Sequence, residues 1–202
     1  MKRIIKGSDG TKRCWWCGTD PGYVHYHDTE WGFPVSDDIR LFEKISLEGF
    51  QAGLSWLTIL RKRENFRLAF RGFDFEKVAR FNRRSVDRLL QDAGIVRHRG
   101  KIEAVLGNAR RALELVEEFG DLATFFWRFE PARLHNHGTN LPSTTPESIA
   151  LSNELKRRGW RFVGPTTMYA FMQAMGLVND HVPGCSVRRQ AAIARRAFQV
   201  PR

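Results

Sequence analysis

Two pairs of potential metal ligands lie at opposite ends of the chain. Cys14 and His27 occur near the N-terminus, and Cys185 follows His181 after Val-Pro-Gly near the C-terminus. Two thiolates and two imidazoles are the number and kind of ligands that a closed tetrahedral zinc site uses. If all four bind one ion, the two ends of the chain must meet in the fold. We therefore predict one structural Zn²⁺ per chain.

Other uses of these residues stay open at this point. Free cysteine is commonly buried, so core packing is the simplest interpretation of His181 and Cys185 taken alone. Two such pairs in a chain with 3 Cys and 6 His favour ligation. Cys14 and Cys17 also form a C-x-x-C motif, which could supply both N-terminal ligands or act as a redox pair. We rank this second, because a redox C-x-x-C precedes a helix in a βαβ unit and no such unit follows.

Length and composition predict one globular domain in a reducing cytoplasm. A chain of 202 residues can bury a core without disulfide bonds, and 3 cysteines cannot form an even disulfide framework. The same count excludes an iron–sulfur cluster held by this chain alone. No leader of basic then apolar residues and no run of about 18 apolar residues occurs. We therefore expect neither secretion nor a membrane span.

The charge favours a polyanionic partner. Lys and Arg outnumber Asp and Glu by 33 to 22, which gives a net charge of +11. A field of this sign attracts nucleic acid, although an acidic protein or an anionic membrane surface would also suit it. The chain has 6 tryptophans, and four of them, Trp15, Trp16, Trp31 and Trp56, lie in its first third. Such rings can stack on bases, but filling a core is their more frequent role.

The apolar spacing is helical, and no alternating run of useful strand length occurs. Asp37 or Asp38 can cap a helix, and Gly49 and Gly53 predict a corner between two helices. Ser85 is the expected cap of a later helix. Further helices are predicted over residues 86–93, ended by a left-handed Gly94, and over 102–116, 147–158 and 165–175, with a proline-rich loop over 131–146. For the basic segment after Cys185, a solvated tail is the simplest expectation.

A glycine-bounded turn from Gly94 to Gly100 leads into the long helix. Backbone N–H groups and the positive end of a helix suit a phosphate, and Arg97, Arg99 and Lys101 add charge. We expect these three side chains to contact DNA phosphates. From the local sequence alone, an ordinary helical hairpin with a solvated basic turn is an equally good interpretation.

Glu48 lies between apolar residues and the predicted glycine corner. A helical glutamate usually caps or forms an ion pair on the surface. If it instead faces a pocket of aromatic rings, its carboxylate can accept hydrogen bonds from the exocyclic amine of a purine while the rings stack on the base. Tyr26 and Trp56 are the rings that we expect there.

Five segments of the chain match one known family in order. They are RCWWCGTDP (13–21), YHDTEWG (26–32), LEGFQAGLSW (47–56), QDAGIVRHRGK (91–101) and FMQAMGLVNDH (171–181). These segments resemble the bacterial DNA-3-methyladenine glycosylase I family, from about residue 13 to residue 185. The resemblance implies the helix-hairpin-helix DNA glycosylase fold, all-α, with a zinc site joining the N- and C-terminal segments. It implies one glycosylase domain over residues 1–202, with terminal extensions at 1–12 and 186–202.

The resemblance also implies a role for each matched residue. The implied roles are zinc ligation by Cys14, His27, His181 and Cys185; base recognition and catalysis by Glu48; stacking by Tyr26 and Trp56, with Trp16, Tyr23 and Trp31 nearby; and insertion into the duplex by Gly53 and Leu54. Cys17 has no implied role. Asp180 is expected to be a structural residue or to support a metal ligand.

The activity implied by the resemblance is excision of 3-methyladenine from alkylated double-stranded DNA in base excision repair. The base would be flipped out and its N-glycosidic bond hydrolysed without a lyase step. We expect a monomer without an obligatory protein partner, in a bacterial cytoplasm and at the nucleoid through DNA. Two other classes stay open: a non-catalytic, zinc-stabilised DNA-binding module and a basic RNA-associated protein.

Overall fold

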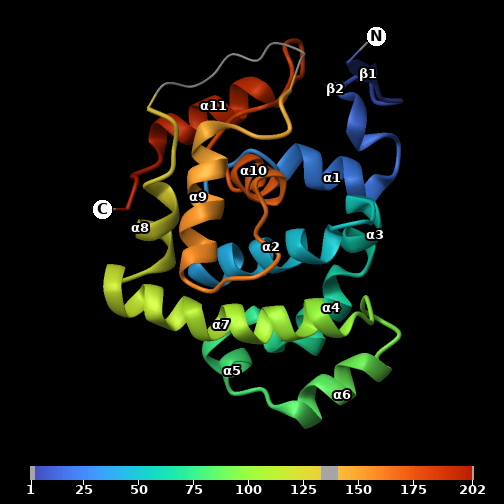
Figure 1. The fold of residues 1–202 in the computed structure, drawn as a ribbon. Coiled ribbons are helices and arrows are strands. Elements are labelled where there is room, and N and C mark those ends of the chain that lie inside the picture. Colours follow the sequence, from blue (N-terminus) through green and yellow to red (C-terminus); the bar gives the residue numbers. More distant parts are fainter. Residues whose placement is uncertain (1–2, 133–140, 202) are drawn as a thin grey trace.

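Helices make up most of the described chain, as the apolar spacing predicts. The computed structural model describes residues 3–132 and 141–201 (Figure 1). The elements are β1 (Ile4–Lys6), β2 (Lys12–Cys14), the short 3₁₀ turn η1 (Trp15–Cys17), α1 (Pro21–Thr29), α2 (Asp38–Gln51), α3 (Trp56–Arg61), α4 (Arg63–Ala69), the 3₁₀ turn η2 (Arg71–Phe73), α5 (Phe75–Ala79), α6 (Arg83–Gln91), α7 (Arg99–Phe119), α8 (Leu122–Trp127), α9 (Pro146–Arg157), α10 (Pro165–Ala174) and α11 (Arg188–Ala197). The predicted all-α class is correct apart from one small hairpin.

Helix α2 is the centre of the molecule. Residues 41–50 are all buried, because α3, α7, α8 and α10 pack around this helix. The N-cap is Asp37, whose carboxylate accepts a hydrogen bond from the backbone N–H of Arg40 at 2.8 Å. Asp38 bonds instead to the backbone N–H groups of Leu122 and Ala123 at the start of α8. Two adjacent aspartates therefore fix the start of α2 and its contact with α8.

The predicted corner between Gly49 and Gly53 begins later than expected. Gly49 lies inside α2, where a Cβ atom would stand 3.3 Å from the Cβ of Phe162, so a glycine allows the close approach of that segment. The chain turns only after Gln51, and Gly53 has a φ of +81° that favours glycine. The loop from α2 to α3 therefore projects at the end of a continuous helix.

The segment that leads into α7 also differs from the prediction. Asn82 is the N-cap of α6, and Ser85 is its partner in a capping box rather than the cap itself. The helix ends at Gln91, and Gly94 is not left-handed. A glycine is needed there because a Cβ atom would meet the Asp92 carboxylate, which accepts a hydrogen bond from the Gly94 N–H.

The later helices α7, α9 and α10 form where the apolar spacing places them, and Gly159 and Gly176 follow α9 and α10 with φ of +82° and +77°. Residues 133–140 of the predicted loop lie outside the described residues. The expected solvated tail is wrong, because α11 docks on the fold. Arg195 forms an ion pair with Glu130, and Phe198 stacks on Trp127 with ring centroids 4.6 Å apart.

The hairpin β1–β2 was not expected, since strands of three residues are too short to show alternation. Its antiparallel register pairs Ile4 with Cys14 and Lys6 with Lys12. The backbone N–H of Ser186 donates to the carbonyl of Lys12 at 2.9 Å, so the C-terminal segment lies against the hairpin. Among the helices described, none is both long and apolar enough to cross a membrane.

Gly176→Ala should destabilise the fold more than a left-handed φ alone explains. An added Cβ would stand 2.5 Å from backbone atoms of Phe33 and Pro34, which cannot move aside as a flexible side chain would. The matched control is Gly120→Ala, at a φ of +88° with no atom within 4 Å of the added Cβ. We expect the control to lose about 1 kcal/mol of unfolding free energy and Gly176→Ala at least about 2 kcal/mol more. Equal losses in urea denaturation would contradict this packing.

Candidate metal centre and adjoining pocket

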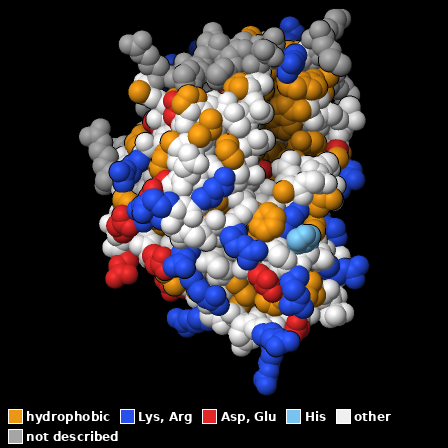
Figure 2. All heavy atoms as spheres, viewed as in Figure 1, with side chains coloured by type: hydrophobic (Ala, Val, Ile, Leu, Met, Phe, Trp, Pro, Cys, Tyr) orange, Lys and Arg blue, Asp and Glu red, His pale blue; other side chains and the backbone are white. Residues whose placement is uncertain are grey.

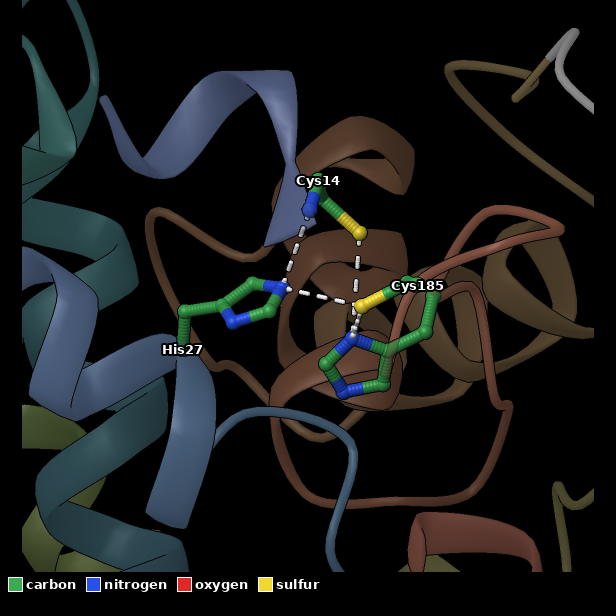
Figure 3. Close-up of side chains that lie close together, drawn as sticks. Cys14, His27 and Cys185 are labelled. Carbon is green, nitrogen blue, oxygen red and sulfur yellow. Dashed lines mark hydrogen bonds between the residues drawn. The ribbon is translucent and has the colours of Figure 1, made fainter. Parts of the chain in front are cut away.

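The four predicted metal ligands lie together in the fold. Cys14 comes from the end of β2, His27 from α1, and His181 and Cys185 from the segment between α10 and α11. All four side chains are buried, and their ligand atoms lie within 4.8 Å of one another. The side chains of Cys14, His27 and Cys185 point toward a common centre (Figure 3). The two ends of the chain therefore meet as the ligand pairs predict.

The spacing within this cluster fits a tetrahedral ion. A zinc ion with Zn–S bonds near 2.3 Å and Zn–N bonds near 2.1 Å separates sulfur from nitrogen by about 3.6 Å. The Sγ of Cys185 is 3.5 Å from Nε2 of His27 and 3.6 Å from Nδ1 of His181. The Sγ of Cys14 is 3.7 Å from the same Nδ1. These residues could hold a metal ion without moving apart.

Neighbouring groups orient both histidines. Nδ1 of His27 is 2.7 Å from the carboxylate of Asp28, which is itself held by the guanidinium of Arg13. Nε2 of His181 is 2.9 Å from the carbonyl oxygen of Trp31. Each acceptor keeps a proton on the outer nitrogen and leaves the inner one free for a metal. Sequence reasoning missed Asp28, although its position next to His27 was a usable signal.

Cys17 and Asp180 lie outside this cluster. The thiol of Cys17 donates to the carbonyl of Cys14 at 3.1 Å, and burial raises its pKa to about 11, so the C-x-x-C alternative gains no support. By contrast, hydrogen bonding between the two thiols of the cluster raises the pKa of Cys14 and lowers that of Cys185, so one of the two is favoured as a thiolate in the absence of an ion. Asp180 accepts hydrogen bonds from Tyr169 and Gln173, so it has a structural role in the fold.

A cavity of about 190 Å³ adjoins the metal cluster. It is lined by Trp16, Tyr23, Tyr26, Trp31, Glu48, Gln51, Trp56, Leu141, Ala170 and Gln173. The five aromatic rings expected from the sequence are all in this list, and so is the expected carboxylate. Sequence reasoning missed the contributions of Leu141 and of α10, because no local pattern indicates which face of a buried helix meets a cavity.

The metal cluster and the cavity share aromatic residues. The ring of Trp16 lies 5.1 Å from that of His27 and 4.8 Å from that of Trp31, which in turn contacts the His181 ring at 4.7 Å. Tyr26 and Trp56 also line the cavity, and their ring centroids are 5.4 Å apart. The positions of His27 and His181 in the metal cluster therefore fix the positions of Trp16 and Trp31 in the cavity wall.

Glu48 is the buried carboxylate of this cavity. Its residue is 5% exposed, and one oxygen, Oε1, is 2.8 Å from Nζ of Lys44 one helical turn earlier. Lys44 was not singled out from the sequence, although the spacing of four residues is typical of a helical ion pair. The carboxylate has a charged partner on one side and the aromatic cavity on the other.

A groove extends from the cavity to the loop between α2 and α3. It is lined by Glu48, Gln51, Ala52, Gly53, Leu54, Thr166, Thr167 and Ala170, three of which also line the aromatic cavity. Leu54 is 42% exposed in this loop and also lines the groove. Figure 2 shows this face with a hollow among hydrophobic side chains in its upper part and Lys and Arg side chains gathered over its lower part.

The turn before α7 places its basic residues differently from one another. Arg97 is exposed, and Arg99 is exposed while it pairs with Asp87 at 3.1 Å. Lys101 is 7% exposed, and its Nζ donates to the carbonyl oxygens of Phe50 and Ala52 at the end of α2. The expectation that Lys101 contacts a phosphate is therefore wrong. Its ammonium group satisfies the last carbonyls of α2 and ties the α2–α3 loop to α7.

Helices α6 and α7 with the turn between them form the helix-hairpin-helix unit expected from the resemblance, in the same helical fold as the aromatic cavity and the cluster of two cysteines and two histidines. A family model described as methyladenine glycosylase matches residues 16–189. The chain therefore belongs to the methyladenine glycosylase family, and the resemblance noted in its sequence is confirmed.

Individual relatives agree with this assignment. The chain is 51% identical over 183 residues to DNA-3-methyladenine glycosylase 1 of Escherichia coli K12, covering 86% of this chain and 95% of the relative. A solved structure of 3-methyladenine DNA glycosylase I shares 50% identity at a TM-score of 0.82, covering 86% of this chain and 98% of that one. A Tyr-to-Phe variant of such an enzyme in complex with 3-methyladenine shares 35% identity at a TM-score of 0.82, covering 87% and 97% of the two chains.

Removal of one thiolate ligand should lower both metal content and stability. Cys14→Ser and Cys185→Ser each remove a ligand from a site that exists only in the folded state, so metal binding energy is lost from folding. Cys17→Ser is the matched control, because that thiol is buried but outside the cluster. We expect lower melting temperatures and less than one metal ion per chain in the first two variants only, by elemental analysis in reducing buffer. Full metal content in both would contradict the assignment.

Proposed function

We propose that this protein is a monofunctional DNA glycosylase that excises 3-methyladenine from alkylated double-stranded DNA in base excision repair. The observation that carries the proposal is the buried Glu48 carboxylate facing a cavity walled by aromatic rings. Membership of the methyladenine glycosylase family supports it. So does the relative that was solved in complex with 3-methyladenine. We assign one catalytic domain to the chain.

The chemistry follows from the charge of the substrate. Methylation at N3 makes adenine cationic, so the glycosidic bond is weakened and the base needs no strong acid to protonate it. Water attacks C1′ of the sugar while the bond electrons return to the base, which leaves as a neutral molecule, and the attacking water releases one proton to solvent. The developing oxocarbenium character at C1′ is stabilised by nearby DNA phosphates. No covalent lysine intermediate is required.

Selection of the base then depends on the walls of the cavity. Electron-rich rings such as Tyr26 and Trp56 attract a cation over a neutral base by about 0.5 to 2 kcal/mol per contact. The carboxylate of Glu48 favours the cation electrostatically and accepts a hydrogen bond from its exocyclic amine. Trp16, Tyr23 and Trp31 complete the apolar surround. Undamaged adenine gains neither the cation–π attraction nor the charge interaction.

We assign the ion of the metal centre as Zn²⁺, one per chain, with a structural role. A donor set of two thiolates and two imidazoles with tetrahedral spacing is typical of closed zinc sites. All four ligands come from the protein, which leaves no open position for a substrate. The ion would hold the N- and C-terminal segments together beside the cavity.

Duplex DNA would lie across the face that carries the cavity and the basic turn. The base enters the aromatic cavity, and the α2–α3 loop with Gly53 and Leu54 fills the gap left in the stack. Arg97 and Arg99 contact the phosphates. We expect the enzyme to act as a monomer, in a bacterial cytoplasm.

Glu48→Gln should lower the release of 3-methyladenine by at least about tenfold, because the amide keeps size and hydrogen bonding but loses the negative charge. Released bases are measured by chromatography after incubation with methylated duplex. Binding to a duplex with an abasic analogue should stay near that of the native protein, since no base then fills the cavity. The surface variant Glu64→Gln removes the same charge on α4 and should retain normal release.

Three results would contradict these assignments. Normal excision by a folded Glu48→Gln variant would remove Glu48 from recognition. If the native protein binds duplex DNA but releases no base, it is a DNA-binding module instead. Preference for single-stranded RNA over damaged duplex would indicate an RNA-associated protein.

Arg97→Gln should weaken binding to damaged and undamaged duplex equally. A phosphate contact carries no sequence or lesion information, and its loss lowers the slope of log K against log salt by about 0.9. The matched control is Arg196→Gln, an exposed arginine on α11, which lies away from the turn before α7 (Figure 1). A change restricted to damaged DNA, or an equal change in both variants, would contradict the assignment of Arg97 to phosphate binding.

A further inference from the structure

Lys44 is a buried lysine that the proposed mechanism does not use. It lies on α2 and is 5% exposed. Its ammonium group is 2.8 Å from Oε1 of Glu48, 2.8 Å from the hydroxyl of Tyr26 and 3.3 Å from the centroid of the Trp56 ring. These three residues are the ones proposed to recognise the base. A lysine is seldom buried without a specific partner, because desolvation of the ammonium is costly.

The ammonium lies behind the wall of the cavity and not inside it. Lys44 lines a second, smaller hollow, whereas Glu48 lines the aromatic cavity. Tyr26 and Trp56 line both and form the partition between them. The ion pair therefore crosses the partition, because Lys44 lines the smaller hollow and contacts Oε1 of Glu48, which lines the aromatic cavity.

Glu48 is the ion-pair partner of Lys44, because the other nearby carboxylates are paired with arginines. The titratable and charged groups around the pair are Tyr23 and Tyr26 on α1, Glu30 at the C-cap of α1, Arg40 and Glu43 on α2, Arg63 and Arg67 on α4, and Lys101 on α7. Glu30 is paired with Arg63 at 2.6 Å, and Glu43 with Arg67 at 2.8 Å. Helix α10 brings no charged residue to the cavity.

Burial disfavours the charged form of Lys44. It lowers the pKa of Lys44, and the charge of Glu48 opposes that shift. In general, a carboxylate that is buried without a counter-charge favours its neutral acid form. A neutral acid would neither attract a cationic base nor present two acceptor oxygens. The ammonium of Lys44 supplies the missing charge before any substrate arrives.

We propose that Lys44 is a positioning residue, which keeps Glu48 ionised and turns its second oxygen toward the flipped base. The proposal rests on the function proposed for Glu48. Lys44 does not touch the substrate, and its effect on excision passes through the carboxylate. Removal of Lys44 should therefore lower the excision rate most at low pH, where an unpaired carboxylate takes up a proton. The effect on the rate should disappear at high pH.

The experiment measures single-turnover release of 3-methyladenine from methylated duplex between pH 5.5 and 9, pH values at which the native protein is first shown to be folded. Lys44→Met keeps the unbranched chain and removes the charge, and Lys44→Arg keeps the charge. Lys156→Met is the matched control, because it removes one exposed positive charge on α9, outside the cavity. Melting curves are recorded for each variant.

For Lys44→Met we expect the acid limb of the pH profile to move up by at least about one pH unit, a tenfold loss on that limb, with recovery toward the native rate at pH 9. Lys44→Arg should restore the native limb, and Lys156→Met should not move it. Unlike a shifted limb, a folding defect would lower the rate at every pH. A native profile in Lys44→Met, or an equal loss at every pH, would overturn the proposal.

A double variant keeps the test decisive if Lys44→Met alone folds poorly. Glu48→Gln with Lys44→Met buries no charge at either position, so it avoids an unpaired buried carboxylate. If Lys44 acts through Glu48, the double variant should release base at the rate of Glu48→Gln alone. A further loss beyond that rate would overturn the proposal. Absence of base release by the native protein would instead refute the proposed function.

Discussion

The closure of the two chain ends around Cys14, His27, His181 and Cys185 is the constraint on which the rest of the structure depends. The ligands come from β2, α1 and the segment after α10, so an ion bound by all four ties three separate parts of the fold. Binding energy of this kind becomes folding energy, because the site does not exist in the unfolded chain. Trp16 and its aromatic neighbours pass this constraint to the cavity, since they contact the ligand histidines on one side and line the cavity on the other.

The second feature is a central helix that buries charge as well as apolar surface. Glu43, Lys44 and Glu48 all lie in the buried run of α2, and each has an oppositely charged partner. Breaking one such pair is costly, because the remaining charge is left buried. A fold selected only for stability would fill these positions with apolar side chains. The charges are better explained by a need for a carboxylate beside the aromatic cavity.

The groove and the α7 turn are linked through Lys101. Its ammonium group binds the last carbonyls of α2, next to the exposed Leu54 loop, while Arg97 in the turn just before α7 faces solvent. One lysine therefore ties the helix-hairpin-helix unit to the segment beside the cavity. Lys101 and Arg97 are four residues apart in the sequence, but one is structural and the other is available to a ligand.

The sequence by itself determined the helical class, the four Cys and His residues that could hold a metal ion, and the aromatic and acidic residues of the cavity, because residue type, spacing and motifs shared with the family carry this information. Only the tertiary structure decided that Lys101 turns inward, that Asp28 supports a ligand and that Lys44 stands behind Glu48. The hairpin β1–β2 and the docking of α11 were likewise decided only by the tertiary structure. A side chain's partner across the fold depends on packing between distant segments, and local patterns record only its chemical type.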